Sequence, residues 1–153
     1  MKALIQRVSR AAVSVAGLEA GRIGQGFVVF LGVRREDSPA EAKFLAEKTA
    51  SLRVFSDDKG LMNLSLWDTG GEVLVISQFT LHADTRKGNR PSFTDAAPAD
   101  SARRLYEEYV RHLQSLLGDA RVRTGVFQAS MQVEILNDGP VTIELKSKNE
   151  SAC

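Results

Sequence analysis

Two periods of apolar and polar residues alternate along this chain and predict a mixture of strands and helices. Apolar residues alternate with polar ones in Ala3–Val8 and in Ala11–Ala16, which predicts two short strands. Phe27–Val33 is apolar throughout, as in a strand buried on both faces. Turns between these segments are predicted at Gly17, Gly21, Gly24 and Gly26.

The period then changes to that of a helix. Ser38-Pro39-Ala40-Glu41 combines a capping box with a proline at the first helical position, which predicts a helix from Pro39 to about Leu52. A second helix is expected from near Pro98 to a stop at Gly118. Its apolar stripe is Leu105, Tyr109, Leu113 and Leu116. Charged pairs one turn apart are expected on it at Arg103–Glu107, Arg104–Glu108 and Glu107–Arg111.

The remaining segments complete an α/β pattern of order β-β-β-α-β-β-α-β-β. Further strands are predicted at Val54-Phe55, Glu72–Leu81, Met131–Leu136 and Val141–Leu145. Turns are predicted at Asp57–Gly60 and Asn137–Pro140, and a loop at Asp84–Pro98. The expected architecture is one domain over residues 1–145, a mixed sheet carrying two helices. A polar tail over residues 146–153 is expected to follow.

Composition narrows the class of protein. A chain of 153 residues with 43% hydrophobic and 25% charged residues fits one ordinary globular domain. Its one cysteine, Cys153, cannot form an internal disulfide, and no apolar run approaches the ~20 residues that span a bilayer. A cytoplasmic protein is therefore expected. The net charge of +1 argues against a protein that coats long nucleic acid, and leaves room for a local basic patch.

The sequence gives little support for a catalytic triad, a metal site or a phosphate-binding loop. A serine–histidine–acid triad needs a histidine, and the two in the chain, His82 and His112, have no triad-like surroundings in the sequence. These two histidines are far apart and the one cysteine is terminal, so no metal site is expected. The glycines before Phe27 are not followed by a helical pattern, which favours a hairpin over a phosphate-binding loop.

Three polar segments remain as candidates for chemistry. At the end of a predicted strand, alternation places Ser77, Phe79 and Leu81 on one face and Gln78 and Thr80 on the other. Taken alone, this segment favours a half-buried strand end, and Asn137–Thr142 favours a tight hairpin turn. The loop Asp84–Phe93 holds three cations and an aromatic ring, suited to phosphates and a base, although taken alone it favours a solvated surface loop.

Together these segments resemble the D-aminoacyl-tRNA deacylase family over Met1 to about Leu145. The two main marks of that family are a Ser-Gln-Phe-Thr-Leu strand end, here Ser77–Leu81, and an Asn-x-Gly-Pro-Val-Thr turn, here Asn137–Thr142. Further matches are Gln6-Arg7-Val8, Leu52-Arg53-Val54-Phe55, Met62-Asn63, Lys87–Phe93 and Thr124-Gly125. The resemblance implies the family's fold, with a barrel-like sheet, and an enzyme that hydrolyses the ester of D-aminoacyl-tRNA.

The resemblance also implies roles for individual residues. Ser77, Gln78, Phe79 and Thr80 would line the site beside the ester, where backbone N–H groups would hold the oxyanion. Thr80 would orient water, since no base is at hand to activate its hydroxyl, and the 2′-hydroxyl of the terminal adenosine would assist. The substrate-binding and chiral-selection residues would be Asn137, Gly139 and Pro140. Gly139-Pro140, with a cis peptide bond, would reach the partner subunit's pocket and exclude L side chains by its backbone.

Partners follow from the same resemblance. The tRNA-binding residues would be Arg86, Lys87, Arg90 and Phe93, close to the 3′-terminal adenosine of D-aminoacyl-tRNA. The protein would be a homodimer without cofactor or metal. Glycine has no side chain to exclude, so glycine mischarged on tRNA(Ala) would also be removed.

One departure from the family pattern concerns the segment after Thr124-Gly125. The family usually has Phe-Gly-Ala there, whereas this chain has Phe127-Gln128-Ala129. A sister group that removes L-alanine from the wrong tRNA carries Pro-Gln-Ala-Thr at the first motif, so Ser77 and Phe79 argue for the D-specific group. Two further functions stay open, a binding module without activity and an esterase of small molecules.

Overall fold

The long strand β1 (Lys2–Val15) has different neighbours along its two edges. The computed structural model describes residues 1–148. On one edge β1 pairs antiparallel with β8 (Gln132–Lys146), from Lys2↔Lys146 to Ser14↔Gln132. On the other edge its first half pairs with β3 (Gly26–Gly32) and its second half with β2 (Leu18–Ile23). The predicted break between Val8 and Ala11 is therefore wrong, because pairing with β8 continues across it through shifts of register.

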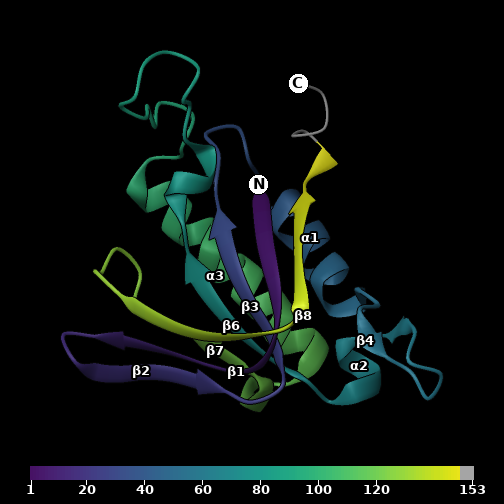
Figure 1. Cartoon of the computed structure of the whole chain (residues 1–153). Coiled ribbons are helices and arrows are strands. Elements are labelled where there is room, and N and C mark those ends of the chain that lie inside the picture. The colour runs from purple at the N-terminus through teal and green to yellow at the C-terminus, as the bar shows by residue number, and fades with distance from the viewer. Residues whose placement is uncertain (149–153) are drawn as a thin grey trace.

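Two crossovers place the long helices on one face of the sheet. The strand order is β2-β1-β3-β6-β7, and β6 (Glu72–Ser77) is parallel to both β3 and β7 (Val122–Thr124). Helix α1 (Pro39–Ser51) precedes β6, and α3 (Ala99–Leu117) connects β6 to β7. Because both crossovers step along the sheet in the same direction, their usual handedness puts both helices on the same side. Figure 1 shows α1 and α3 together behind the sheet.

Both predicted helices are confirmed, with their predicted ends. Helix α1 begins after Ser38, whose side chain accepts a bond from the N–H of Ala40, while the Ser38 N–H donates to Glu41 over 2.9 Å. Helix α3 ends at Leu117, and Gly118 follows at φ +94°. These ends were predictable because caps depend on residues within one turn of each other.

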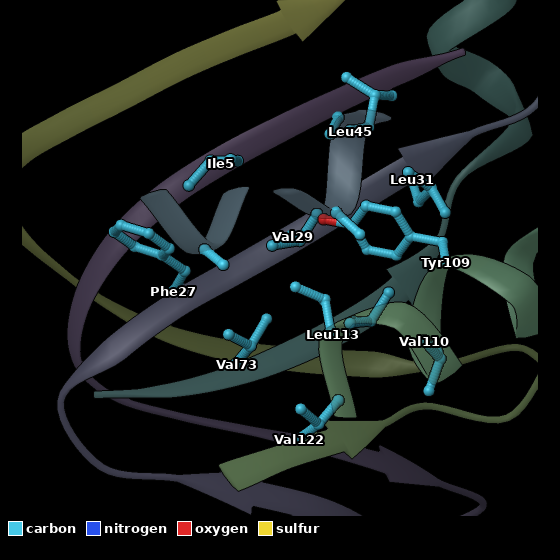
Figure 2. Packing of buried hydrophobic residues seen from close by; sticks show 14 of the residues in the cluster. Ile5, Phe27, Val29, Leu31, Leu45, Val73, Tyr109, Val110, Leu113 and Val122 are labelled. Atoms are coloured by element: carbon cyan, nitrogen blue, oxygen red, sulfur yellow. The ribbon is translucent and has the colours of Figure 1, made fainter. Parts of the chain in front are cut away.

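The main core lies between the helices and the sheet. Val29 and Leu31 of β3 face Leu45 of α1 and Tyr109 of α3 (Figure 2). Tyr109 is fully buried, and its hydroxyl meets that of Thr49 at 2.7 Å, so the polar atom has a partner inside the core. The prediction that Phe27–Val33 is a buried central strand is confirmed.

The opposite face of the sheet closes upon itself. A second cluster joins β1, β2, β3 and β6; its buried residues are Val8, Ala11, Val13, Ile23, Val28, Leu74 and Ile76. Strand β2 approaches β6 and β7 so closely that a Cβ on Gly21 would lie 3.0 Å from the Thr124 carbonyl oxygen. Gly21 is thus within a strand and not in the predicted turn, and its missing side chain allows the sheet to curl into a nearly closed barrel.

Short elements account for most of the remaining differences from the predicted order. The sequence patterns did not indicate β5 (Met62–Leu64), α2 (Leu66–Thr69), β7 or the 3₁₀ turns η1 (Phe79–His82) and η2 (Asp119–Arg121). Residues 1–148 therefore contain three α-helices where two were predicted. Elements of three or four residues are too short to show a period, although α2 has its own capping box, Ser65 with Asp68. The predicted strand at Val54-Phe55 is β4 (Phe55–Ser56).

The fold extends beyond the predicted domain end at Leu145. Lys146 completes β8, and the buried Ser147 donates its backbone N–H to the Met1 carbonyl oxygen over 3.0 Å. The rest of the predicted polar tail, 149–153, lies outside the described residues.

Candidate active site

The Ser77–Leu81 segment changes conformation in its middle. Ser77 is the last residue of β6, and Phe79 begins the 3₁₀ turn η1. The predicted alternation of side chains through Leu81 is therefore wrong beyond Ser77, because the turn rotates successive side chains by about 120° rather than 180°. The backbone N–H of Gln78 donates to the Leu31 carbonyl oxygen over 2.8 Å, which fixes the turn to the end of β3.

A pocket of about 470 Å³ opens at this end of β6. Ser77, Gln78 and Phe79, three of the four residues predicted to lie beside the ester, line it. Thr80, the fourth, is exposed in η1 and is not among the lining residues. The rest of its lining comes from distant segments: Leu31, Val33, Ile76, Ala102, Tyr106, Phe127, Gln128, Ala129, Met131 and Val133. Of these, the sequence drew attention only to Phe127, Gln128 and Ala129, the segment where the chain departs from the family pattern. The pocket is of a size that suits an amino-acid side chain and its ester.

The polar groups of the pocket are hydroxyls and amides. The Gln78 amide donates to the Thr80 hydroxyl oxygen, which leaves the hydroxyl hydrogen of Thr80 available to another acceptor. Burial raises the pKa of Tyr106 well above its ordinary value, and its hydroxyl donates to the Val75 carbonyl oxygen over 2.9 Å. Tyr106 therefore stays protonated at neutral pH. None of the lining residues is a histidine or a carboxylate.

Phe127 is held in the pocket wall by two residues of α3. The centroid of its ring lies 5.6 Å from the centroid of the Tyr106 ring. The guanidinium carbon of Arg103 lies 4.8 Å from the Phe127 centroid. The predicted pairing of Arg103 with Glu107 is not among the ion pairs of residues 1–148. The pairs that form on this helix join Glu108 to Arg111 and to His112. Arg103 therefore contacts the ring of Phe127 in place of the predicted ion pair with Glu107.

Gln128 stands in a backbone conformation that favours glycine. Its φ is +65°, and it lines the pocket. The left-handed region costs an ordinary L-residue about 1–2 kcal/mol. Because of this cost, a glycine would suit the turn better than another residue. The positive φ of Gln128 shows that the turn is formed here with glutamine in that position.

We expect Gln128→Gly to stabilise the protein by about 0.5–1 kcal/mol, because relief of the left-handed strain exceeds the added chain entropy of glycine. Thermal unfolding should show a rise in Tm of about 1–4 °C. Gln128→Ala is the matched control, since it removes the amide and keeps the strain. An unchanged or lower Tm for the glycine variant would contradict this account.

The loop at Asp84–Pro98 is closed at its base and exposed at its tip. Asp84 and Ser92 exchange two backbone hydrogen bonds of 2.7 and 2.9 Å. The Arg86 guanidinium binds the Asp84 carboxylate and lowers the pKa of Asp84 to about 2, so Arg86 is already neutralised. Lys87 and Arg90 are exposed at the tip. Figure 1 shows the loop projecting beyond the end of the sheet.

Phe93 is the residue of this loop that contacts a pocket residue, Phe79. Its ring meets that of Phe79 edge to face, with centroids 5.0 Å apart. The exposed fractions are 57% for Phe79 and 37% for Phe93, so the pair presents aromatic surface to solvent beside the pocket. Exposed aromatic surface next to cations is typical of sites that bind single-stranded nucleic acid.

Asn137–Thr142 forms a bulge within one strand and not the predicted hairpin turn. Both halves of β8 pair antiparallel with the same strand, and between Gln6↔Thr142 and Val8↔Asn137 one residue of β1 faces four of β8. A hairpin would instead pair the two halves with each other. The peptide bond between Gly139 and Pro140 is cis, as the resemblance implied.

Arg7, opposite the bulge, holds it in place. Its Nε donates to the Asp138 carbonyl oxygen over 3.2 Å and forms an ion pair with the Asp138 carboxylate, and its Nη1 donates to the Val54 carbonyl oxygen. Asn137 donates to the carbonyl oxygens of Arg7 and Val141 over 2.9 and 3.1 Å. Three segments matched to the family thus meet at this bulge.

The bulge and the pocket are not brought together within one chain. Gly139 and Pro140 are exposed and do not line the pocket. Gly139 lies six residues beyond Val133, the last pocket residue on β8, which corresponds to roughly 20 Å of extended strand.

Other candidates from the sequence stay outside the site. His82 is buried at the end of η1, and His112 pairs with Glu108 on α3. Among residues 1–148, no three His, Cys, Asp or Glu side chains gather as they would around a metal ion. Cys153 lies outside the described residues. In the same part of the chain, no helix is long and apolar enough to cross a membrane.

Comparison with known proteins agrees with this geometry. Residues 4–146 match the family described as D-Tyr-tRNA(Tyr) deacylase. A D-aminoacyl-tRNA deacylase of Heliobacterium modesticaldum is 55% identical over 148 residues, covering 97% of each chain. One of Roseiflexus castenholzii is 56% identical over 147 residues, covering 96% of this chain and 92% of the other.

Solved structures share the fold. A c-Myc DNA unwinding element binding protein superposes with a TM-score of 0.92 at 42% identity, covering 96% of this chain and 99% of the other. A probable eukaryotic D-amino acid tRNA deacylase superposes with a TM-score of 0.82 at 15% identity, covering 94% and 97%. The barrel-like architecture is therefore shared even where few residues are.

Proposed function

The chain belongs to the D-Tyr-tRNA(Tyr) deacylase family, and from this we propose how its pocket carries out the family's reaction, the hydrolysis of the ester in D-aminoacyl-tRNA. The proposal rests on one observation: Ser77, Gln78 and Phe79 line a largely apolar pocket that is large enough for an amino acid. The α-amino acid lies in the pocket and its ester carbonyl faces the η1 turn. We propose a cytoplasmic enzyme, because charged tRNA is made and used there.

The turn η1 supplies hydrogen-bond donors for the ester carbonyl. The backbone N–H groups of Phe79 and Thr80 open the turn, a position where N–H groups have no acceptor inside the helix. An ester carbonyl placed against them gains charge in the transition state, and each donor to such an oxyanion commonly contributes a few kcal/mol. The Thr80 hydroxyl, which accepts from Gln78, has its hydrogen free to hold the attacking water.

Thr80→Ala is expected to lower kcat about tenfold, since one hydrogen bond to the water is lost, which corresponds to roughly 1.4 kcal/mol. The melting temperature should stay unchanged because the side chain is exposed. Thr80→Ser, which keeps the hydroxyl, is the control and should retain most of the rate. If the alanine variant hydrolyses D-tyrosyl-tRNA as fast as the wild type, Thr80 has no part in the mechanism.

Chiral selection is proposed to come from a second copy of the chain. Gly139-Pro140 is exposed, held by Arg7, and distant from the pocket of its own chain. Inserted into the pocket of a partner, its backbone stands against the α-carbon and leaves no room for an L side chain. Glycine presents nothing to exclude, so glycine carried by tRNA(Ala) is also a substrate on this proposal. The protein then works as a homodimer.

The end of the tRNA is proposed to lie along the Phe79–Phe93 pair. The terminal adenine has a face that stacks on exposed rings, and Lys87 and Arg90 provide charge near the loop tip for phosphates. Arg86 contributes less, because Asp84 already neutralises it. Contact with only the last nucleotides agrees with the net charge of +1.

The direct test compares release of labelled amino acid from D-tyrosyl-tRNA and L-tyrosyl-tRNA, with and without a chelator. We expect hydrolysis of the D form alone, at the same rate in both conditions. Hydrolysis of L-alanyl-tRNA instead would assign the protein to the sister group. Binding without any release would leave a module without activity, and equal cleavage of a free amino-acid ester would indicate a small-molecule esterase.

A further inference from the structure

Arg103 lies at the edge of the pocket without being part of its lining. Its neighbours on α3, Ala102 and Tyr106, line the pocket, and so does Phe127, over whose ring the guanidinium carbon of Arg103 lies, 4.8 Å from the centroid. This contact fixes a long, flexible side chain beside the pocket. A guanidinium has five N–H donors, and a cation–π contact with one ring leaves donors available for another partner.

The charge of Arg103 is not neutralised by a neighbour. Its side chain is exposed, and within residues 1–148 it forms no ion pair, although Glu107 lies one turn further along the same helix. Elsewhere on α3, Glu108 pairs with Arg111, so carboxylates on this helix are able to bind arginines. An unpaired guanidinium held beside a pocket by an aromatic ring is suited to bind an anion with two oxygens.

We propose that Arg103 binds a backbone phosphate of the tRNA end, next to the terminal adenosine. This inference rests on the proposed function, in which the amino acid occupies the pocket and the nucleotide chain leaves it. A phosphodiester has two free oxygens that match the guanidinium fork. Phe127 connects the two parts of the site, since the ring that forms the pocket wall also orients the cation.

The rim of the pocket, made by Phe79, Phe93 and Arg103, then offers two kinds of contact to a nucleotide. The Phe79–Phe93 pair presents aromatic surface, and Arg103 presents charge from α3. The loop cations are less well placed to fix a phosphate at the rim. Arg86 is bound to Asp84, and Lys87 and Arg90 are at the exposed loop tip without a ring to orient them. Arg103 is accordingly a substrate-binding residue that acts on the tRNA part of the substrate.

The test uses two substrates that differ in phosphate. Arg103→Met is compared with the wild type on D-tyrosyl-tRNA and on 3′-D-tyrosyl-adenosine, which has no phosphate. We expect the KM for the tRNA substrate to rise about five- to tenfold, with kcat changed less than twofold. The slope of log KM against log salt concentration should fall by about one, as for the loss of one phosphate contact. The effect on the adenosine ester should be less than twofold.

Arg104→Met is the matched control. Arg104 is the next residue of α3, equally charged and exposed, and lines a different cavity between α3 and the start of α1. It should leave both KM values and the salt slope unchanged. Arg103→Lys keeps the charge without the planar fork and should restore the salt slope while recovering only part of the affinity.

Each contrary result has its own meaning. If Arg103→Met impairs both substrates equally, the arginine serves only to hold Phe127 in the pocket wall and the proposal is wrong. If it impairs neither, or if Arg104→Met has the same effect, no phosphate is bound there. If the wild type hydrolyses neither substrate, the proposed function itself fails, and this inference fails with it.

Discussion

Replacing the 2′-hydroxyl of the terminal adenosine by hydrogen is expected to lower kcat by about 10²- to 10⁴-fold, the range of a lost general acid–base group. The pocket provides hydroxyls and amides, and none of its lining residues is a histidine or a carboxylate. Its one phenol, Tyr106, has its pKa raised further by burial, and its hydroxyl donates to the Val75 carbonyl oxygen. The hydroxyl adjacent to the ester is then the group on hand to assist proton transfer.

The measurement is single-turnover hydrolysis of D-tyrosyl-tRNA ending in 2′-deoxyadenosine, beside the normal substrate. Competition by the deoxy substrate against normal hydrolysis gives its affinity separately. We expect the affinity to change little, because the hydroxyl acts in the transition state. A rate within threefold of normal would mean that a protein group supplies the catalysis, and Thr80 would be the first to reconsider.

Gly139→Ala is expected to lower the rate on D-tyrosyl-tRNA at least tenfold and to reduce the preference for D over L. Gly139 has φ +122°, and an added Cβ would lie 2.8 Å from Cγ2 of Val141 and 2.9 Å from Nη2 of Arg7. The methyl group therefore strains the backbone and pushes Arg7 away from the carbonyls it binds. The stability cost should be about 1–3 kcal/mol.

Gly60→Ala is the control that separates the effect of backbone strain on stability from the effect of distorting the bulge. Gly60 has φ +75° with nothing within 4 Å of an added Cβ, and it lies in the turn before β5. This control should lose stability and keep full activity and chiral preference. If Gly139→Ala is folded and retains the wild-type ratio of D to L rates, the bulge plays no part in selection.

Mixing variants tests whether the bulge acts in a partner's pocket. Ala129→Trp fills the pocket of its own chain and should be inactive. A dimer of one Ala129→Trp chain and one Gly139→Ala chain contains one site in which both pocket and bulge are wild type. Random exchange of chains in a two-fold dimer should then restore about a quarter of the wild-type activity. No recovery would contradict the exchange of bulges between subunits.

The elements predicted correctly are those set by residues close together in the chain. The capping box at Ser38, the stop at Gly118 and the apolar run Phe27–Val33 each lie within a few residues, and each is where it was expected. Patterns that depend on distant pairing failed. Asn137–Pro140 has the composition of a hairpin turn, yet β1 pairs with both sides of it and makes it a bulge. Local composition cannot show which strand will lie alongside.

The site, like the fold, was predictable where it depends on neighbouring residues in the chain and not where it depends on distant ones. The motif identifies Ser77, Gln78, Phe79 and Thr80, and the structure places the first three at the pocket and Thr80 just outside its lining. Val133 has nothing local to distinguish it from a core residue, and it lines the pocket because β8 returns beside β1. Helical spacing predicts that Arg103 pairs with Glu107, but its guanidinium lies over the ring of Phe127, 24 positions along the chain, which a helical period cannot indicate.

The pairing of β1 with β8 also has a kinetic consequence. Lys2 pairs with Lys146, so one edge of β1 stays open until β8 has been synthesised. Contacts between such distant residues slow folding, toward the range of about milliseconds to seconds. Val133 of the pocket lies on that late strand, and Met131 directly precedes it. A nascent or shortened chain therefore has no complete site, and hydrolysis of charged tRNA begins only once synthesis of the whole domain is finished.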